Sequence, residues 1–109
     1  MKNIKPKDSL KEFERTVQAQ AETPYELRLF VTGSTPNSLR AVHNLKRICD
    51  SHLQGKYTLE VIDLYQKPEA AKEFNIVAAP TLIKLKPAPM KKLLGDLSNE
   101  ARVLEAMYA

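Results

Sequence analysis

Val77-Ala78-Ala79-Pro80-Thr81-Leu82 is the most informative segment of this 109-residue chain for its fold. Pro80 stands directly before Thr81 to Leu85, a stretch rich in Leu and Ile that predicts a strand. Pro80 is preceded by two segments, each of which predicts a strand followed by a helix. Because an X–Pro bond prefers the trans form by only about 0.5–1 kcal/mol, a cis bond at this position costs little. We predict that the Ala79–Pro80 bond is cis and leads into the third strand of a sheet.

The two strand–helix units before this proline are visible as changes in apolar spacing. Residues 25–32 alternate between an apolar and a mixed face, which predicts a strand. Thr35 and Pro36 suit the N-cap and the first position of a helix that runs to about Leu53. A second strand is predicted over residues 57–64 and a short helix over 68–74. The apolar face of the long helix is expected to hold Leu39, Val42, Leu45, Ile48 or Cys49, and Leu53.

The segment after Pro80 predicts a hairpin and a final helix. Residues 81–85 and 90–94 read as strands, joined by Lys86-Pro87-Ala88-Pro89, in which two prolines cannot continue a central strand. Ser98 is the expected N-cap of a last helix that runs to the end of the chain. Val103, Leu104 and Met107 are expected to face inward from it.

This order of elements predicts a thioredoxin-like α/β fold: an N-terminal helix, then β-α-β-α-β-β-α, with helices on both faces of a mixed four-stranded sheet. Residues 1–24 are assigned to an N-terminal extension with a short amphipathic helix, begun by a capping box at Ser9 and Glu12. Residues 25–109 form the domain. A thioredoxin enzyme carries Cys-x-x-Cys where this chain has Thr32-Gly33-Ser34-Thr35-Pro36-Asn37-Ser38. The missing thiols favour a binding protein over an enzyme.

The composition of the chain further limits which class of protein it can be. The chain has a formal charge of +4, 43% hydrophobic residues, and no apolar run near the ~20 residues that cross a bilayer. With no secretory signal, we expect a cytoplasmic protein that contacts neither membrane nor nucleic acid.

Cys49 lies on the apolar stripe of its helix and is expected to be buried, and His43 and His52 lack a metal-binding spacing. We expect no metal and no cofactor.

Four lysines gather near the predicted hairpin: Lys84, Lys86, Lys91 and Lys92. Such a cluster suits an acidic protein face or a phosphate. Lysines on strand edges also deter sheets from pairing with one another, and the sequence leaves both interpretations open.

From about Tyr25 to Leu104 the chain resembles the KaiB family of the cyanobacterial circadian clock. The resemblance rests on four segments in matching order: Leu29-Phe30-Val31-Thr32-Gly33-Ser34-Thr35-Pro36-Asn37-Ser38, Val61-Ile62-Asp63, Ala79-Pro80-Thr81-Leu82 and Gly95-Asp96-Leu97-Ser98. It implies a non-enzymatic regulator, because KaiB proteins bind the hexameric ATPase KaiC and then sequester KaiA. It also implies two folds: a thioredoxin-like monomer that binds KaiC, and a homo-tetramer with a different, KaiB-specific C-terminal half.

The resemblance also bears on which of these folds and contacts to expect. Ala106 stands where the family commonly has glycine, and alanine favours a helix by about 0.8–1 kcal/mol, so we expect the thioredoxin-like form, with the tetrameric fold as the alternative. The family commonly has lysines at Asn75 and His43 and an acidic tail, and these differences are expected to weaken the usual KaiC contact. The candidate partner-binding residues are Pro36, Asn37, Ser38, Arg40, Pro80, Lys84 and Lys92.

Two other functions stay open at this point. One is a thioredoxin-like oxidoreductase or glutathione-dependent protein outside any clock, with Ser34 or Ser38 in place of the thiol. Cys49 fits that role poorly, because it lies near the C-terminal end of its helix, where the helix dipole disfavours a thiolate. The other is a stand-alone, stress-related module that has kept the fold and changed its partner.

Overall fold

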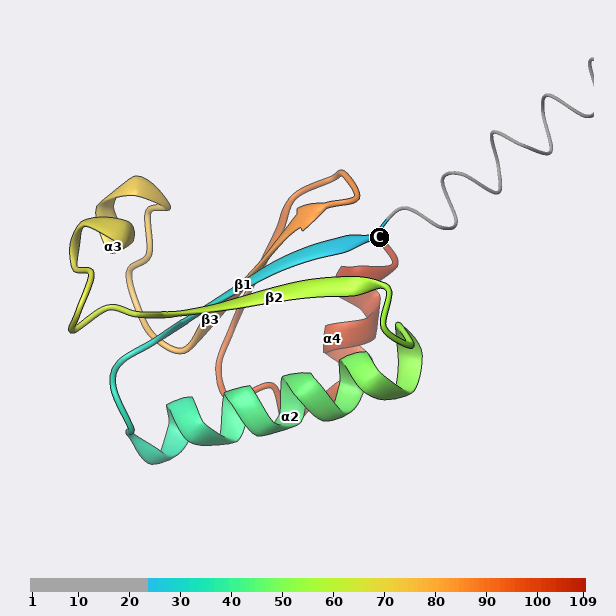
Figure 1. The fold of residues 1–109 in the computed structure, drawn as a ribbon, viewed down its shortest axis with the longest axis horizontal. Helices are drawn as coiled ribbons and strands as arrows, with labels where there is room; N and C mark the ends of the chain where they lie inside the picture. The colour runs from blue at the N-terminus through green and yellow to red at the C-terminus, as the bar shows by residue number, and fades with distance from the viewer. Residues whose placement is uncertain (1–23) are drawn as a thin grey trace, which may run out of the picture.

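The computed structural model describes residues 24–109, so the helix expected within residues 1–24 lies outside the described part. Four strands form one sheet in the order β2-β1-β3-β4 (Figure 1). The central strand β1 (Tyr25–Val31) pairs in parallel with β2 (Tyr57–Asp63) and antiparallel with β3 (Thr81–Lys86). Strand β4 (Lys91–Leu94) pairs antiparallel with β3. The sheet is therefore mixed, as predicted.

Three helices cover the sheet from both sides. Helices α2 (Pro36–His52) and α4 (Glu100–Met107) lie against one face, and α3 (Glu69–Glu73) lies toward the other (Figure 1). A strand across residues 98–108 would indicate the alternative C-terminal half, and these residues instead contain α4 and no strand. The predicted order β-α-β-α-β-β-α and the thioredoxin-like arrangement are confirmed. No helix within residues 24–109 is long and apolar enough to cross a bilayer.

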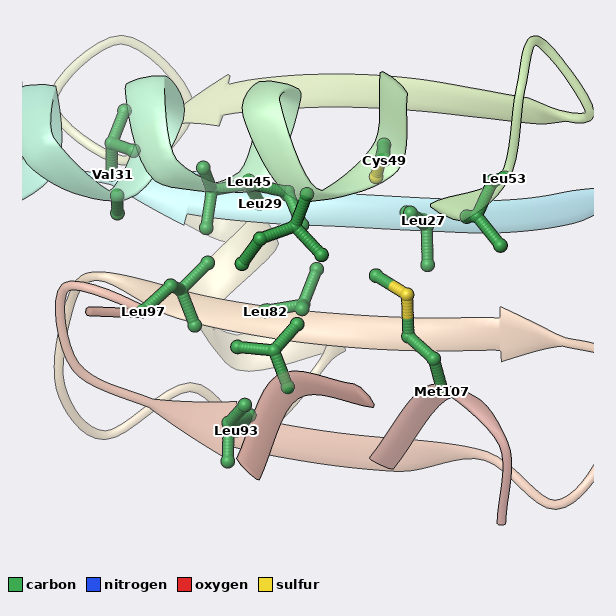
Figure 2. Close-up of a cluster of buried hydrophobic side chains, with 13 residues drawn as sticks. Leu27, Leu29, Val31, Leu45, Cys49, Leu53, Leu82, Leu93, Leu97 and Met107 are labelled. Atoms are coloured by element: carbon green, nitrogen blue, oxygen red, sulfur yellow. The ribbon is translucent and has the colours of Figure 1, made fainter. Parts of the chain in front are cut away.

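The larger core lies between the sheet and helices α2 and α4 (Figure 2). Strand β1 is buried on both faces, because it is flanked by β2 and β3 and covered on both sides. The residues of this core that Figure 2 labels come from the sheet, from α2 and α4 and from the loops next to these helices: Leu27, Leu29, Val31, Leu45, Cys49, Leu53, Leu82, Leu93, Leu97 and Met107.

A smaller core on the opposite face attaches α3. It consists of Phe30, Ile62 and Ile83 of the sheet and Ala70 of α3. The Phe30 and Phe74 ring centroids lie 5.3 Å apart, and the Arg28 guanidinium lies 5.1 Å above the Phe74 ring. This cluster places the end of α3, and with it the segment that leads to Pro80.

Two details of the helices differ from the sequence prediction. Leu39 is 56% exposed and Ser38 is 1% exposed, so the buried stripe of α2 begins at Ser38 rather than at Leu39. The physical reason is local, since the Ser38 hydroxyl accepts a hydrogen bond from the Thr32 N–H at 3.1 Å. The N-cap of α4 is Asn99, whose side chain accepts from the Arg102 N–H at 3.2 Å, and not Ser98.

Candidate partner-binding surface

The loop between β1 and α2 is held by hydrogen bonds from its first backbone N–H groups to Ser38 and Asp63. The Gly33 N–H donates to Oδ1 of Asp63 at 3.0 Å, which ties the loop to the end of β2. Gly33 has φ +58°, and a Cβ there would lie 3.0 Å from Cδ2 of the Tyr65 ring. Glycine therefore suits this position both in backbone conformation and in space. Pro36 and Asn37 at the start of α2 are left exposed.

The second loop of the surface is the segment before β3 that contains Pro80. The Ala79–Pro80 bond is cis, as predicted. The Thr81 hydroxyl donates to the Ala78 carbonyl at 2.6 Å, and the Pro80 carbonyl accepts from the Gly95 N–H at 3.0 Å. Pro80 itself is buried, whereas Val77 is 85% exposed. The residues that this loop offers to a partner are therefore those that precede the proline.

Two open hollows lie on either side of this second loop. The first, which we call the loop hollow, is lined by Thr32, Thr35, Pro36, Asn37 and Ala79. The second, which we call the strand-edge hollow, is lined by Asn75, Ile76, Val77, Thr81, Lys92, Leu94 and Arg102. The loop before β3 thus forms a shared wall, with Ala79 on one side and Val77 on the other.

Arg40 is exposed but is tied to its surroundings. Its Nε lies 3.4 Å from Oδ2 of Asp96, and its terminal nitrogen donates to Oδ1 of Asn37. Hydrogen bonds from Ser98, and then the neighbouring Arg40, hold the pKa of the Asp96 carboxyl below its usual range. Arg40 therefore connects the start of α2 to the segment that precedes α4.

Lys92 and Asn75 lie together on the surface. The Lys92 ammonium donates to the Asn75 carbonyl at 3.1 Å, and Asn75 has a left-handed φ of +55°. Both residues are exposed, as is His43 on α2. One basic side chain therefore lies directly beside Asn75.

Lys84 is not part of this surface, so the prediction that it offers an exposed charge is wrong. Its exposed fraction is 1%, and its ammonium donates to the Met107 carbonyl at 3.2 Å, at the C-terminal end of α4. Burial, and then the nearby Lys91, lower the pKa of the Lys84 amine. A cation at a helix C-terminus is favoured by the carbonyls that end there. Lys84 therefore stabilises the docking of α4.

Three of the predicted contact residues are thus buried: Ser38, Pro80 and Lys84. Each holds neighbouring backbone in place through a hydrogen bond instead of contacting solvent. The exposed ones are Pro36, Asn37, Arg40 and Lys92. Sequence reasoning missed Val77 and Leu94, which are 85% and 53% exposed. Their apolar character signalled core positions, and only the fold shows that they face outward.

Cys49 is buried, as predicted. Its exposed fraction is 0%, and burial, with a smaller contribution from Asp50, raises the pKa of its thiol to about 12. A thiol that stays protonated at neutral pH is a poor nucleophile. Within the described part of the chain, no group of His, Cys, Asp and Glu side chains is placed to hold a metal ion.

This shift predicts how stability changes in alkaline solution. Above pH 9, the ordinary pKa of the group, the unfolded chain loses the thiol proton while the folded chain keeps it, so rising pH favours unfolding. Because Cys49→Ala removes this contribution, the free energy of unfolding of the wild type should fall relative to the variant by about 1–2 kcal/mol between about pH 9 and 10.5. Urea unfolding of both proteins at each pH measures this, and the largest causes of the raised pKa of Tyr57, its hydrogen bond to Asp50 and burial, are present in both. A pH-independent difference would contradict the prediction.

The comparisons with known proteins agree with this architecture. A KaiB domain model matches residues 28–107. The circadian clock oscillator protein KaiB of Nostoc punctiforme is 47% identical over 85 residues, covering 78% of this chain and 82% of that protein. The N-terminal domain of Synechococcus elongatus SasA superposes with a TM-score of 0.65 at 25% identity, covering 76% of this chain and 79% of that one. Mitochondrial thioredoxin 3 of Saccharomyces cerevisiae shares the fold, with a TM-score of 0.64 at 17% identity over 92% of this chain and 90% of that one. The chain therefore belongs to the KaiB family.

Proposed function

We propose that this protein is a non-enzymatic regulator that binds a KaiC-type ATPase, or a related signalling protein, in circadian or stress-related control in the cytoplasm. The observation that carries the proposal is the loop at the start of α2. It occupies the place of the thioredoxin thiols, holds none, and presents Pro36 and Asn37 to solvent. Membership of a family whose curated relatives are clock oscillator proteins supports a regulatory role.

The chemistry of the single thiol supports the non-enzymatic part of the proposal. Cys49 is the one cysteine of the chain. It is covered by the core between α2 and the sheet, and the pKa of its thiol is raised by burial. Catalytic thiols need the opposite environment, which is partly exposed and electropositive. A disulfide-exchange reaction at Cys49 would require α2 to leave the sheet.

The proposed contact consists of the exposed residues Pro36, Asn37, Arg40 and Lys92 with the loop that ends at Ala79. Arg40 and Lys92 supply positive charge, and the strand-edge hollow supplies apolar surface at Val77 and Leu94. Charged residues at such an interface contribute mainly to the rate of association and to the choice of partner. An acidic face on the partner is therefore expected.

The proposal is tested by mixing the full chain with the KaiC-type ATPase encoded in the same genome and ATP. The mass of the species is then measured by size-exclusion chromatography with light scattering. A complex heavier than the ATPase alone is the expected result. An intact ATPase that elutes without this protein would overturn the proposed function.

A charge-reversal pair locates the contact. Lys92→Glu is expected to weaken the complex by about tenfold, because it places a carboxylate where the partner is acidic. Lys56→Glu makes the same change of charge on an exposed residue in the turn between α2 and β2, at the opposite end of α2 from Pro36 and beside the strand at the opposite edge of the sheet from β4, and is expected to bind like the wild type. Thermal unfolding of both variants checks that the fold is unchanged. Equal affinity of the two variants would place the interface elsewhere.

A further inference from the structure

The outer edge of β4 carries backbone groups without a partner in the described part of the chain. Strand β4 is the last strand of the sheet and pairs only with β3 there. The Gly95 N–H donates to the Pro80 carbonyl at 3.0 Å, in the same register in which Leu93 lies opposite Leu82. Because hydrogen-bonded pairs alternate along an antiparallel ladder, Leu93 is bonded to β3. The N–H and C=O groups of Lys92 and Leu94 therefore point away from the sheet.

The side chains around this edge form two kinds of surface. On one side is the strand-edge hollow, where Val77 and Leu94 are exposed apolar residues beside Lys92. On the other side is a second open hollow, lined by Lys91, Leu93, Arg102, Glu105, Ala106 and Ala109. Arg102 lines both hollows, so it stands over the edge itself. A strand laid along β4 would place alternate side chains in the two hollows.

The charge of this edge favours an acidic occupant. Residues 81–94 contain four lysines and no aspartate or glutamate. None of the ion pairs among residues 24–109 includes Lys91, Lys92 or Arg102. Glu105 is the single carboxylate side chain that lines either hollow. Pairing β4 with β4 of a second copy would bring the lysines of both copies together, which disfavours a homodimer through this edge.

We propose that the outer edge of β4 binds an extended acidic segment of a partner protein by strand addition. The backbone of the segment bonds to the N–H and C=O groups of Lys92 and Leu94. Alternate side chains of the segment are carboxylates, which pair with Lys91 and Arg102 in one hollow, and apolar groups, which lie on Val77 and Leu94 beside Lys92 in the other. Such addition takes affinity from backbone hydrogen bonds and specificity from alternate side chains. This site extends beyond the contact residues of the proposed function and does not depend on which protein supplies the segment.

The test uses a capped peptide of about eight residues that alternates valine and glutamate, with a valine–lysine peptide as its charge control. NMR titration of the full chain follows the backbone amides. The acidic peptide is expected to shift the Lys92 and Leu94 amide signals and to slow their hydrogen exchange, and the basic peptide is expected to do neither. The proposal would be overturned if the acidic peptide left the amide signals unchanged. It would also be overturned if both peptides changed them equally, or if the changes were confined to β2.

A matched pair of variants separates backbone pairing from charge. Lys92→Pro removes an N–H that points outward and makes no bond to β3, and proline is tolerated on an edge strand at such a position. Lys92→Ala removes the same charge and keeps the N–H. The proline variant is expected to bind the acidic peptide about tenfold more weakly than the alanine variant. Equal affinities would show that only charge acts and would overturn strand addition.

Other occupants of the edge give distinct results. If a second copy occupies it, sedimentation of the wild type without peptide shows self-association that Lys92→Pro abolishes. If another part of this chain occupies it, the Lys92 and Leu94 amides are protected before any peptide is added. Either result overturns the proposal. The ATPase experiment above can fail while the peptide binds, so the two proposals are judged separately.

Discussion

Replacement of Lys84 by glutamate is expected to lower the free energy of unfolding by about 3–5 kcal/mol, which is the usual cost of a buried charge without a partner. In the native protein the Lys84 ammonium is buried and donates to the Met107 carbonyl at 3.2 Å. A carboxylate at this position would face the carbonyls that end α4, where the helix dipole also disfavours negative charge. Helix α4 is therefore expected to leave the sheet first.

Two comparison variants show whether burial is the cause. Lys84→Met keeps an apolar stem and loses the hydrogen bond, so it is expected to cost about 1–3 kcal/mol. Lys86→Glu makes the same change of charge two residues along β3, where the side chain is 69% exposed, and is expected to cost less than about 1 kcal/mol. Urea unfolding followed by circular dichroism measures all three. Equal losses for Lys84→Glu and Lys86→Glu would show that Lys84 does not support α4.

The second large effect is expected at Phe30, where alanine should cost about 3–5 kcal/mol. Phe30 has an exposed fraction of 0% and joins the sheet to Phe74, just after α3. Helix α3 has only five residues, so its place depends on this cluster rather than on helix propensity. Losing the ring should also loosen the segment from Asn75 to Ala79 that forms the wall between the two hollows.

Urea unfolding gives the stability change, and amide hydrogen exchange shows where it acts. Faster exchange in α3 and in residues 75–79 than in α2 is the expected pattern. Leu39→Ala serves as the control, because Leu39 is a large apolar residue that is 56% exposed and should cost little when truncated. If Phe30→Ala lowers protection evenly over the whole domain, α3 is not a separate unit attached by this ring.

Most of the candidate site could be placed from sequence, but not its exposure. The start of α2 was predictable because proline at the first helical position and a strand-to-helix change of spacing are local signals. The cis bond before β3 was predictable from the place of Pro80 in the expected thioredoxin-like order of elements and from the low cost of a cis X–Pro bond. The sequence did not predict that Val77 is exposed and Pro80 is buried. These residues lie in a loop, which has no repeating pattern that would distinguish an inner face from an outer one.

Lys84 and Lys92 show this limit most clearly. Both lie in strands and both were candidates for an exposed basic surface. The alternation of a strand tells which residues share a face, but it does not tell which helix covers that face or where the helix ends. Because α4 ends over Lys84 and leaves Lys92 uncovered, one lysine stabilises the fold and the other is available to a partner.

The sequence was sufficient to predict the order of strands and helices within residues 24–109, the cis proline, the absence of a thiol pair and the burial of Cys49. These properties follow from local spacing and from residue types that act within a few positions of one another. Only the tertiary structure decided which polar residues are buried, which apolar residues are exposed, and that β4 has a free outer edge within residues 24–109. The physical reason is that burial depends on contacts between elements far apart in the chain, such as α4 with β3 and the Pro80 loop with β4.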